Sequence, residues 1–232
     1  MARSETPLLA VLVDADNSSP RWAEPIFDEI ASLGEASVRR IYGDFSRGQM
    51  SGWNDKMPSM ALVPHHQPAN TVGKNSSDIA LVIDAMDLLH SGRFDGFVLV
   101  SSDSDFTRLA SRIREQGLDV YGIGERKTPE AFRKACKRFI FIENLIAEPE
   151  PKNAVKRDSP KAAIPMINNA MQAIDPEQEW FPLGLLGQTI QANHPDFDSR
   201  TYGSAKLSDL VQRAGRYEIR RGANVVEVRR KD

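Results

Sequence analysis

Residues 97–106 read Phe-Val-Leu-Val-Ser-Ser-Asp-Ser-Asp-Phe, an apolar run followed at once by two carboxylates. The apolar part is short, continuous and partly β-branched, which is typical of a strand buried on both faces of a parallel sheet. From Phe106 onward, apolar residues recur at helical spacing until Gly117. The stretch therefore predicts a strand, a tight turn and a helix, with Asp103 and Asp105 at the carboxyl end of the strand. Open α/β sheets bind their ligands at that end.

The same pattern recurs on both sides of this stretch. Residues 8–13 form a second apolar run that ends in acid, Asp14-Ala15-Asp16-Asn17. Further strands are expected at 36–42, 61–63, 118–123 and 139–142, with helices at about 20–33, 78–89 and 128–136. Strands that alternate with helices predict an α/β domain with a doubly wound, mostly parallel sheet.

Two connecting segments carry more specific expectations. The polar stretch from Gly43 to Pro58 is long for a compact domain, which makes it a candidate functional loop. In the helix after Asp78, the inward apolar stripe is expected to be Ile79, Val82, Ile83, Met86 and Leu89. Asp84 and Asp87 then fall on the solvated face, and His65 and His66 belong to surface or loop packing.

Length and composition predict a soluble, two-domain chain. The 232 residues suffice for one sizeable domain, expected at 7–147, and a small one at 164–230. Residues 148–163 contain three prolines and little apolar content, so they are expected to be a linker. The single cysteine, Cys136, points to a reducing compartment, and the absence of a long apolar run or signal core favours the cytoplasm.

The second domain is expected to be a small winged helix-turn-helix. Helices are predicted at 164–174, 183–192 and 204–214, and a hairpin is predicted around 221–224. From Lys206 to the end there are eight basic and four acidic residues, although the whole chain has a net charge of −2. That local excess favours phosphate contact, and an ordinary solvated surface is the alternative.

The strand-end carboxylates predict a metal site. Asp14, Asp103 and Asp105 would meet at one edge of the sheet if the first and fourth strands are neighbours, and Asp78 would join them from the start of a helix. Like charges packed together repel, and all-oxygen ligation selects magnesium or manganese. Lys74 could meet a phosphate. Capping of the following helix is the alternative role for any one of these aspartates, and it suits Asp105, just before Phe106. Asp16 is expected either to cap a helix or to support the metal ligands from behind.

The motifs Asp14-x-x-Asn17, Lys74-x-x-x-Asp78 and Ser101-Ser102-Asp103-Ser104-Asp105-Phe106 resemble those of NYN domains, a PIN-like branch of the nucleases. The resemblance covers residues 7–147 and implies a metal-dependent ribonuclease. It implies Mg²⁺ or Mn²⁺ as cofactor, held by the catalytic carboxylates Asp14, Asp78, Asp103 and Asp105. It also implies that Asn17, Lys74 and Ser102 bind the substrate.

The segment 197–210, with Phe197-Asp198, Tyr202-Gly203 and Lys206-Leu207, is similar to the OST-HTH or LOTUS domain, a winged helix associated with RNA and with protein partners. The phosphate contacts expected in this domain are Lys206, Arg213, Arg216, Arg220 and Arg221.

Three functions follow as hypotheses. The leading one is an endoribonuclease that cleaves single-stranded or structured RNA with the help of a divalent ion. The second is a non-catalytic RNA-binding adaptor on the same fold. The third is a phosphatase of the haloacid dehalogenase type, with Asp14 as nucleophile and Asp16 as acid. The third lacks that family's glycine and threonine or valine at Asn17-Ser18.

Overall fold

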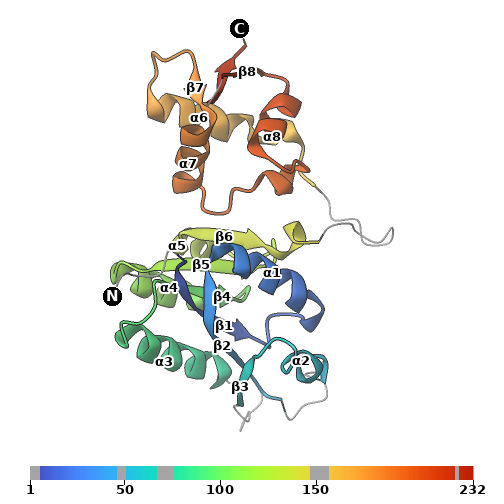
Figure 1. The fold of residues 1–232 in the computed structure, drawn as a ribbon, viewed down its shortest axis with the longest axis vertical. Coiled ribbons are helices and arrows are strands. Elements are labelled where there is room, and N and C mark those ends of the chain that lie inside the picture. The colour runs from blue at the N-terminus through green and yellow to red at the C-terminus, as the bar shows by residue number, and fades with distance from the viewer. Residues whose placement is uncertain (1–5, 46–50, 67–75, 147–156, 223–224, 232) are drawn as a thin grey trace. The chain divides into compact units, whose positions relative to one another are not determined.

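The computed structural model describes residues 6–45, 51–66, 76–146, 157–222 and 225–231. The chain divides into two compact units, Met1–Ile146 and Ala147–Asp232, and each is described here by itself (Figure 1).

The first unit contains one six-stranded sheet in which every pair of neighbours is parallel. Its strands are β1 (Leu8–Asp14), β2 (Glu35–Gly43), β3 (Val63–His66), β4 (Gly96–Val100), β5 (Asp119–Gly124) and β6 (Arg138–Phe141). The order is β3-β2-β1-β4-β5-β6, with Leu12 of β1 opposite Leu99 of β4. This order confirms the doubly wound α/β fold. The first and fourth strands are neighbours, and their carboxyl ends lie side by side.

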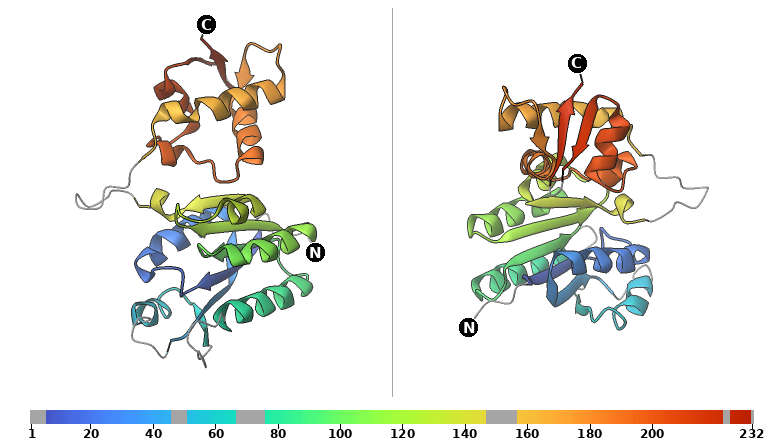
Figure 2. Two further views of the ribbon diagram at one scale, coloured as in Figure 1. Left: turned by 180° about the vertical axis from the view of Figure 1, so that it is seen from behind. Right: turned by 45° about the horizontal axis from the view of Figure 1, so that its top comes forward.

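Helices cover both faces of the sheet (Figures 1 and 2). They are α1 (Ala23–Leu33), α2 (Ser51–Lys56), α3 (Ser76–His90), α4 (Thr107–Glu115) and α5 (Glu130–Ala135), with short 3₁₀ helices η1 (Pro20–Trp22), η3 (Ser104–Phe106) and η4 (Ile142–Asn144). Two separate hydrophobic cores result. One joins α3, α4 and α5 to the face that carries Ala10 and Leu12, and the other joins α1 and Trp53 to the face that carries Val11 and Val13.

The stretch from Gly43 to Pro58, expected as an irregular loop, contains helix α2. Trp53 of this helix is fully buried, and its indole Nε1 donates to the carbonyl of Ser18 at 3.2 Å. A single large aromatic therefore anchors a polar segment that has no helical periodicity of its own.

The inward face of α3 agrees only in part with the expected one. Leu89 is buried and Val82 and Met86 pack against the core, as expected. Leu81, Ala85 and Leu88 are also buried, whereas Ile79 and Ile83 are 60% and 56% exposed. The sequence carries two overlapping apolar stripes, and both have helical spacing. The buried stripe is the one that keeps Asp78 and Asp84 beside the sheet.

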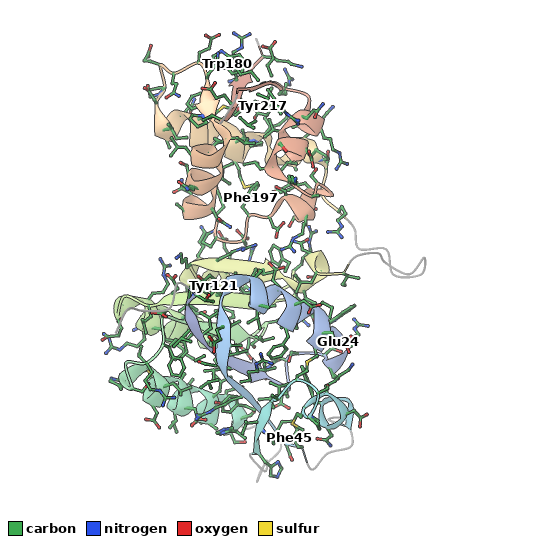
Figure 3. All side chains as sticks on the ribbon, in the orientation of Figure 1. Glu24, Phe45, Tyr121, Trp180, Phe197 and Tyr217 are labelled. Atoms are coloured by element: carbon green, nitrogen blue, oxygen red, sulfur yellow. The ribbon has the colours of Figure 1, made fainter. Side chains whose placement is uncertain are left out.

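The second unit combines short helices with a three-stranded antiparallel sheet of order β7-β9-β8. Its elements are η5 (Pro160–Ala163), α6 (Ile164–Ile174), β7 (Phe181–Pro182), α7 (Leu183–Asn193), η6 (Ser199–Tyr202), α8 (Leu207–Ala214), β8 (Tyr217–Arg221) and β9 (Val226–Arg230). Trp180 and Tyr217 lie toward one end of this unit and Phe197 toward the other (Figure 3). Tyr217 is buried, and its hydroxyl donates to Asn168 Oδ1 at 2.9 Å.

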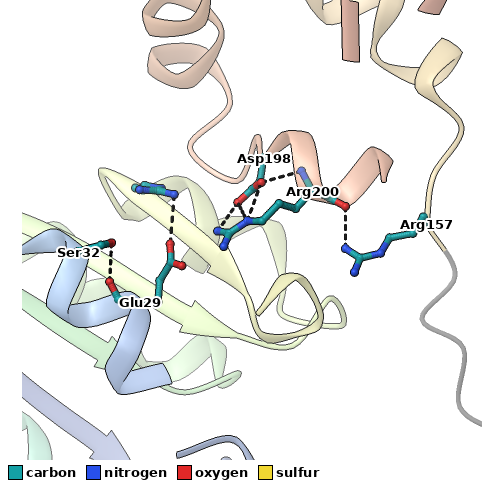
Figure 4. Close-up of polar contacts among 6 residues, drawn as sticks. Glu29, Ser32, Arg157, Asp198 and Arg200 are labelled. Atoms are coloured by element: carbon teal, nitrogen blue, oxygen red, sulfur yellow. Dashed lines mark hydrogen bonds and ion pairs between the residues drawn. The ribbon is translucent and has the colours of Figure 1, made fainter. Parts of the chain in front are cut away.

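Part of the expected linker is structured. Asp158 N donates to the carbonyl of Thr201 at 2.9 Å, and Ala163 of η5 is fully buried. Arg157 donates to the carbonyl of Arg200 at 2.7 Å, and the Arg200 guanidinium pairs with Asp198 at 2.7 Å (Figure 4). Residues from 157 onward therefore belong to the second unit.

Candidate functional site

Asp14 ends strand β1 and is almost completely buried. Its Oδ1 accepts from the backbone N–H groups of Asp16 and Asn17, both at 3.1 Å. Its Oδ2 accepts from Ser101 Oγ at 2.6 Å and from Asn17 Nδ2 at 2.8 Å. Burial raises the pKa of Asp14, and the hydrogen bonds from Ser101 and Asn17 oppose that rise. Because a carboxylate offers about four lone-pair positions, these four donors occupy it fully.

The turn after β4 is fixed to Asp14 through Ser101. Ser101 Oγ donates to Asp14 and also accepts from the backbone N–H of Asp103 at 3.0 Å. Asp103 in turn caps η3, since its Oδ1 accepts from the N–H of Asp105 at 2.9 Å. The capping residue is therefore Asp103, whereas the sequence favoured Asp105 for that role. Ser101 was not singled out from the sequence, although a hydroxyl at a strand end beside two carboxylates is a signal for it.

Asp78 lies in the first turn of α3 and is half-buried. Its pKa is raised to about 6, first by burial and then by neighbouring negative charges. Those charges belong to Asp14, Asp103, Asp16 and Asp105. Ser77 Oγ donates to Asp16 Oδ2 at 2.8 Å, which ties the start of α3 to the turn after β1. Carboxylates from three distant segments thus lie close enough to repel one another.

The donor set of this cluster suits a hard divalent cation, because carboxylate oxygens are the ligands that Mg²⁺ and Mn²⁺ prefer. Within the described parts of the chain, no three acidic, histidine or cysteine side chains are placed as a ready-made metal site. The hydrogen bonds of Asp14 supply a physical reason, since Ser101 and Asn17 hold the oxygens that an ion would need. The residues fit a divalent ion in chemistry, and an ion at Asp14 would have to displace a donor.

Comparison with known proteins identifies the family of each domain. The family model of the NYN domain matches residues 8–143, more than half of the chain. The chain belongs to the NYN domain family. The model of the OST-HTH/LOTUS domain matches residues 154–226, so a second domain follows the NYN domain. Together these families indicate an RNA-related nuclease or RNA-binding protein.

A solved structure supports the fold alone. The crystal structure of a protein of unknown function from Vibrio parahaemolyticus aligns with a TM-score of 0.50 at 20% identity, over 60% of this chain and 94% of that chain. A search of curated proteins found no match. In the described part of the chain, no helix has both the length and the apolar character needed to cross a bilayer.

Of the three residues expected to bind substrate in the NYN domain, Asn17 and Ser102 have local roles. Asn17 is exposed but holds Asp14 with its side-chain amide. Ser102 Oγ accepts from the backbone N–H of Glu125 at 2.9 Å, which ties the acidic turn to the end of β5. Lys74 lies outside the described residues.

Two of the five basic residues expected to contact phosphate in the OST-HTH domain are engaged within it. Arg213 donates to the carbonyl of Gly203 and, at 2.9 Å, to Ser204 Oγ. Arg220 pairs with Glu227 at 2.6 Å, and its guanidinium lies 4.2 Å from the centre of the Trp180 ring. These contacts commit both arginines to the structure of the domain.

The other three basic residues expected to contact phosphate are Lys206, Arg216 and Arg221. All three are exposed, and none forms an ion pair with another described side chain. Of the five expected residues, these three are the ones that remain available for phosphate.

Proposed function

We propose that the NYN domain is a divalent-metal-dependent endoribonuclease and that the OST-HTH domain holds its RNA or a protein partner. The observation that carries this proposal is the convergence of aspartates around Asp78. Five carboxylates come from β1, the turn after it, α3 and the turn after β4; burial, and after it the repulsion from the other four, raises the pKa of Asp78 to about 6. A cluster of this kind is unfavourable in isolation and is stabilised by a cation. Family membership supports the same conclusion, since NYN domains belong to a nuclease superfamily.

The residues of the proposed site have different roles. Asp14, Asp78, Asp103 and Asp105 are the proposed ligands of the ion, which when bound would activate water and neutralise charge on the phosphodiester. Ser101 holds Asp14 and Asp103 in a fixed relation through two hydrogen bonds. Asn17 limits the rotation of the Asp14 carboxylate.

Lys206, Arg216 and Arg221 are proposed to bind phosphates of the RNA in the second domain, which would make binding dependent on salt. No role in phosphate binding is retained for Arg213 and Arg220, because both are engaged locally. The family match also argues against the phosphatase hypothesis, in which Asp14 would be a covalent nucleophile.

The test uses the purified full chain with labelled single-stranded RNA, structured RNA and DNA, in Mn²⁺, in Mg²⁺ and in chelator. We expect RNA cleavage that requires an ion and that disappears in Asp103→Asn. Asparagine caps helices as well as aspartate does, so this variant should keep the η3 cap and the fold. Asp87→Asn, on the exposed side of α3, is the matched control and should cleave at the wild-type rate.

The result that contradicts catalysis is equal activity in wild-type protein and Asp103→Asn. A chain that binds RNA with the same affinity in Mn²⁺ and chelator, and cleaves nothing, would instead be an RNA-binding adaptor.

A further inference from the structure

A second polar cluster lies on the α3 face of the sheet, centred on Asp84. The sequence placed Asp84 on the solvated side of its helix, and the structure shows that this was wrong. Asp84 Oδ2 accepts from Tyr42 Oη at 2.8 Å and from Arg40 Nη1 at 2.9 Å, and lies 2.9 Å from His65 Nδ1. One carboxylate oxygen of α3 therefore holds three side chains that come from β2 and β3.

The cluster is adjacent to the carboxylates of the proposed active site. Tyr42 of β2 is the register partner of Asp14 in β1 and of His65 in β3. Neighbouring strands lie about 4.8 Å apart, so the backbone of His65 is about 10 Å from that of Asp14 along the carboxyl edge of the sheet. Because side chains alternate along a strand, Asp14 faces the same side as Leu12, whose core also contains Tyr42.

The contact with Asp84 suggests a role for each ring nitrogen of His65. Nδ1 lies 2.9 Å from Asp84 Oδ2, so a proton on Nδ1 faces the carboxylate, and in that tautomer Nε2 is a hydrogen-bond acceptor. Arg40 pairs with the same carboxylate and balances its charge. The Tyr42 ring, fully buried, lies 5.0 Å from the imidazole and limits its rotation. The His65 side chain remains 30% exposed.

An acceptor nitrogen on a partly exposed imidazole binds only groups that carry a hydrogen to donate. A phosphate has no hydrogen to donate at neutral pH, whereas the ribose 2′-hydroxyl is a donor that RNA has and DNA lacks. A strand bound at Asp14 and Asp78 would have its neighbouring nucleotides within the distance that separates Asp14 from His65.

We propose that His65, positioned by Asp84, accepts a hydrogen bond from a ribose 2′-hydroxyl beside the carboxylate cluster and so makes the NYN domain prefer RNA over DNA. This inference rests on the proposed ribonuclease function. It adds a residue that touches substrate, His65, and a positioning residue, Asp84.

The experiment compares cleavage and binding of matched single strands of one sequence, as RNA, as DNA and as RNA with single 2′-deoxy substitutions. The variants are His65→Phe, which removes the acceptor, His65→Gln, which keeps one, and Asp84→Asn, which no longer fixes the tautomer. His66→Phe is the matched control, because the Nδ1 of His66 accepts from the Phe45 N–H at 3.2 Å and is not part of the Asp84 cluster.

We expect the ratio of kcat/KM for RNA to kcat/KM for DNA to fall about tenfold in His65→Phe, because the variant loses one hydrogen bond to the substrate. DNA activity and the control ratio should not change, and His65→Gln should recover part of the preference. At one nucleotide position, a 2′-deoxy substitution in the RNA should lower cleavage by the wild-type protein by the same factor. The same substituted RNA should be cleaved by His65→Phe as fast as the unsubstituted RNA.

Two results overturn the inference. If wild-type protein cleaves RNA and His65→Phe loses RNA and DNA activity equally, or retains the wild-type ratio, then His65 does not recognise ribose although the ribonuclease proposal stands. If wild-type protein neither binds nor cleaves any of the strands, both proposals fail.

Discussion

Replacing Asp78 with asparagine is expected to stabilise the metal-free protein at neutral pH. Burial of the Asp78 carboxylate, together with the negative charges of the neighbouring aspartates, raises its pKa from 3.8 to about 6. Below pH 3.8 the group is protonated in both states and has no effect. As the pH rises toward 6, the unfolded chain loses this proton before the folded chain does, so folding stability falls. Above pH 6 the full cost is present, and asparagine removes it.

The size of this stabilisation follows from the difference between the ordinary pKa of the Asp78 carboxyl, 3.8, and its raised value in the folded protein, about 6. An interval of that size corresponds to roughly 3 kcal/mol of linkage free energy. Asp78 is only half-buried, so solvent screening reduces the figure to on the order of 1 kcal/mol. Loss of the favourable interaction between the carboxylate and the N-terminus of α3 offsets part of this gain. A rise in the unfolding temperature of about 2–4 °C is expected for a unit of this size.

The assay is scanning calorimetry of the full chain in chelator, at pH 7.5 and at pH 4.0, for wild-type protein, Asp78→Asn and the control Asp87→Asn. The rise in unfolding temperature of Asp78→Asn over wild-type protein should be seen at pH 7.5 and should shrink toward zero at pH 4.0. Mn²⁺ should reverse the order, because the wild-type protein gains binding energy that the variant cannot match. The reasoning is refuted if Asp78→Asn is less stable than wild-type protein in chelator at pH 7.5, or if its gain is the same at both pH values.

Two further pairs of substitutions test contacts within the two units. In Gly124→Ala, the new Cβ would lie 2.5 Å from the backbone carbonyl of Ser101, so we expect a loss of about 1–3 kcal/mol in urea titrations and reduced RNA cleavage. Gly184→Ala, whose Cβ meets no atom within 4 Å, should keep or raise stability and serves as the control. Arg213→Ala loses the hydrogen bonds of Arg213 in the second unit and should lower the unfolding temperature of that unit. Arg216→Ala should weaken RNA binding at low salt without changing stability. Equal unfolding temperatures for the two variants would contradict this difference in roles.

The strands were the most predictable part of the fold. Strands buried on both faces need continuous apolar runs, so β1 and β4 were visible in the sequence together with the carboxylates that follow them. The closeness of Asp14 to Asp103 then depended only on those two strands being neighbours, which the sheet order confirms.

The orientation of α3 could not be predicted, because Ile79 and Ile83 are spaced as well for burial as Leu81 and Ala85. Tertiary packing decides which of the two stripes is buried. Because the sequence analysis selected the other stripe, it assigned Asp84 to the solvated face. The cross-strand partner of Arg220 could not be predicted either. A hairpin loop at 221–224 would place Val225 opposite Arg220, whereas β8 extends to Arg221 and Glu227 lies opposite Arg220, where opposite charges attract.

The four hydrogen bonds around Asp14 have a consequence for the order in which the protein is assembled. Two backbone amides, the Asn17 amide and the Ser101 hydroxyl already satisfy this buried carboxylate. The polypeptide can therefore reach its native form without an ion, unlike small domains in which metal binding supplies the energy of folding. In the proposed ribonuclease, binding of the ion would then be a separate event that follows folding, so the supply of the ion would control the activity of molecules that are already folded.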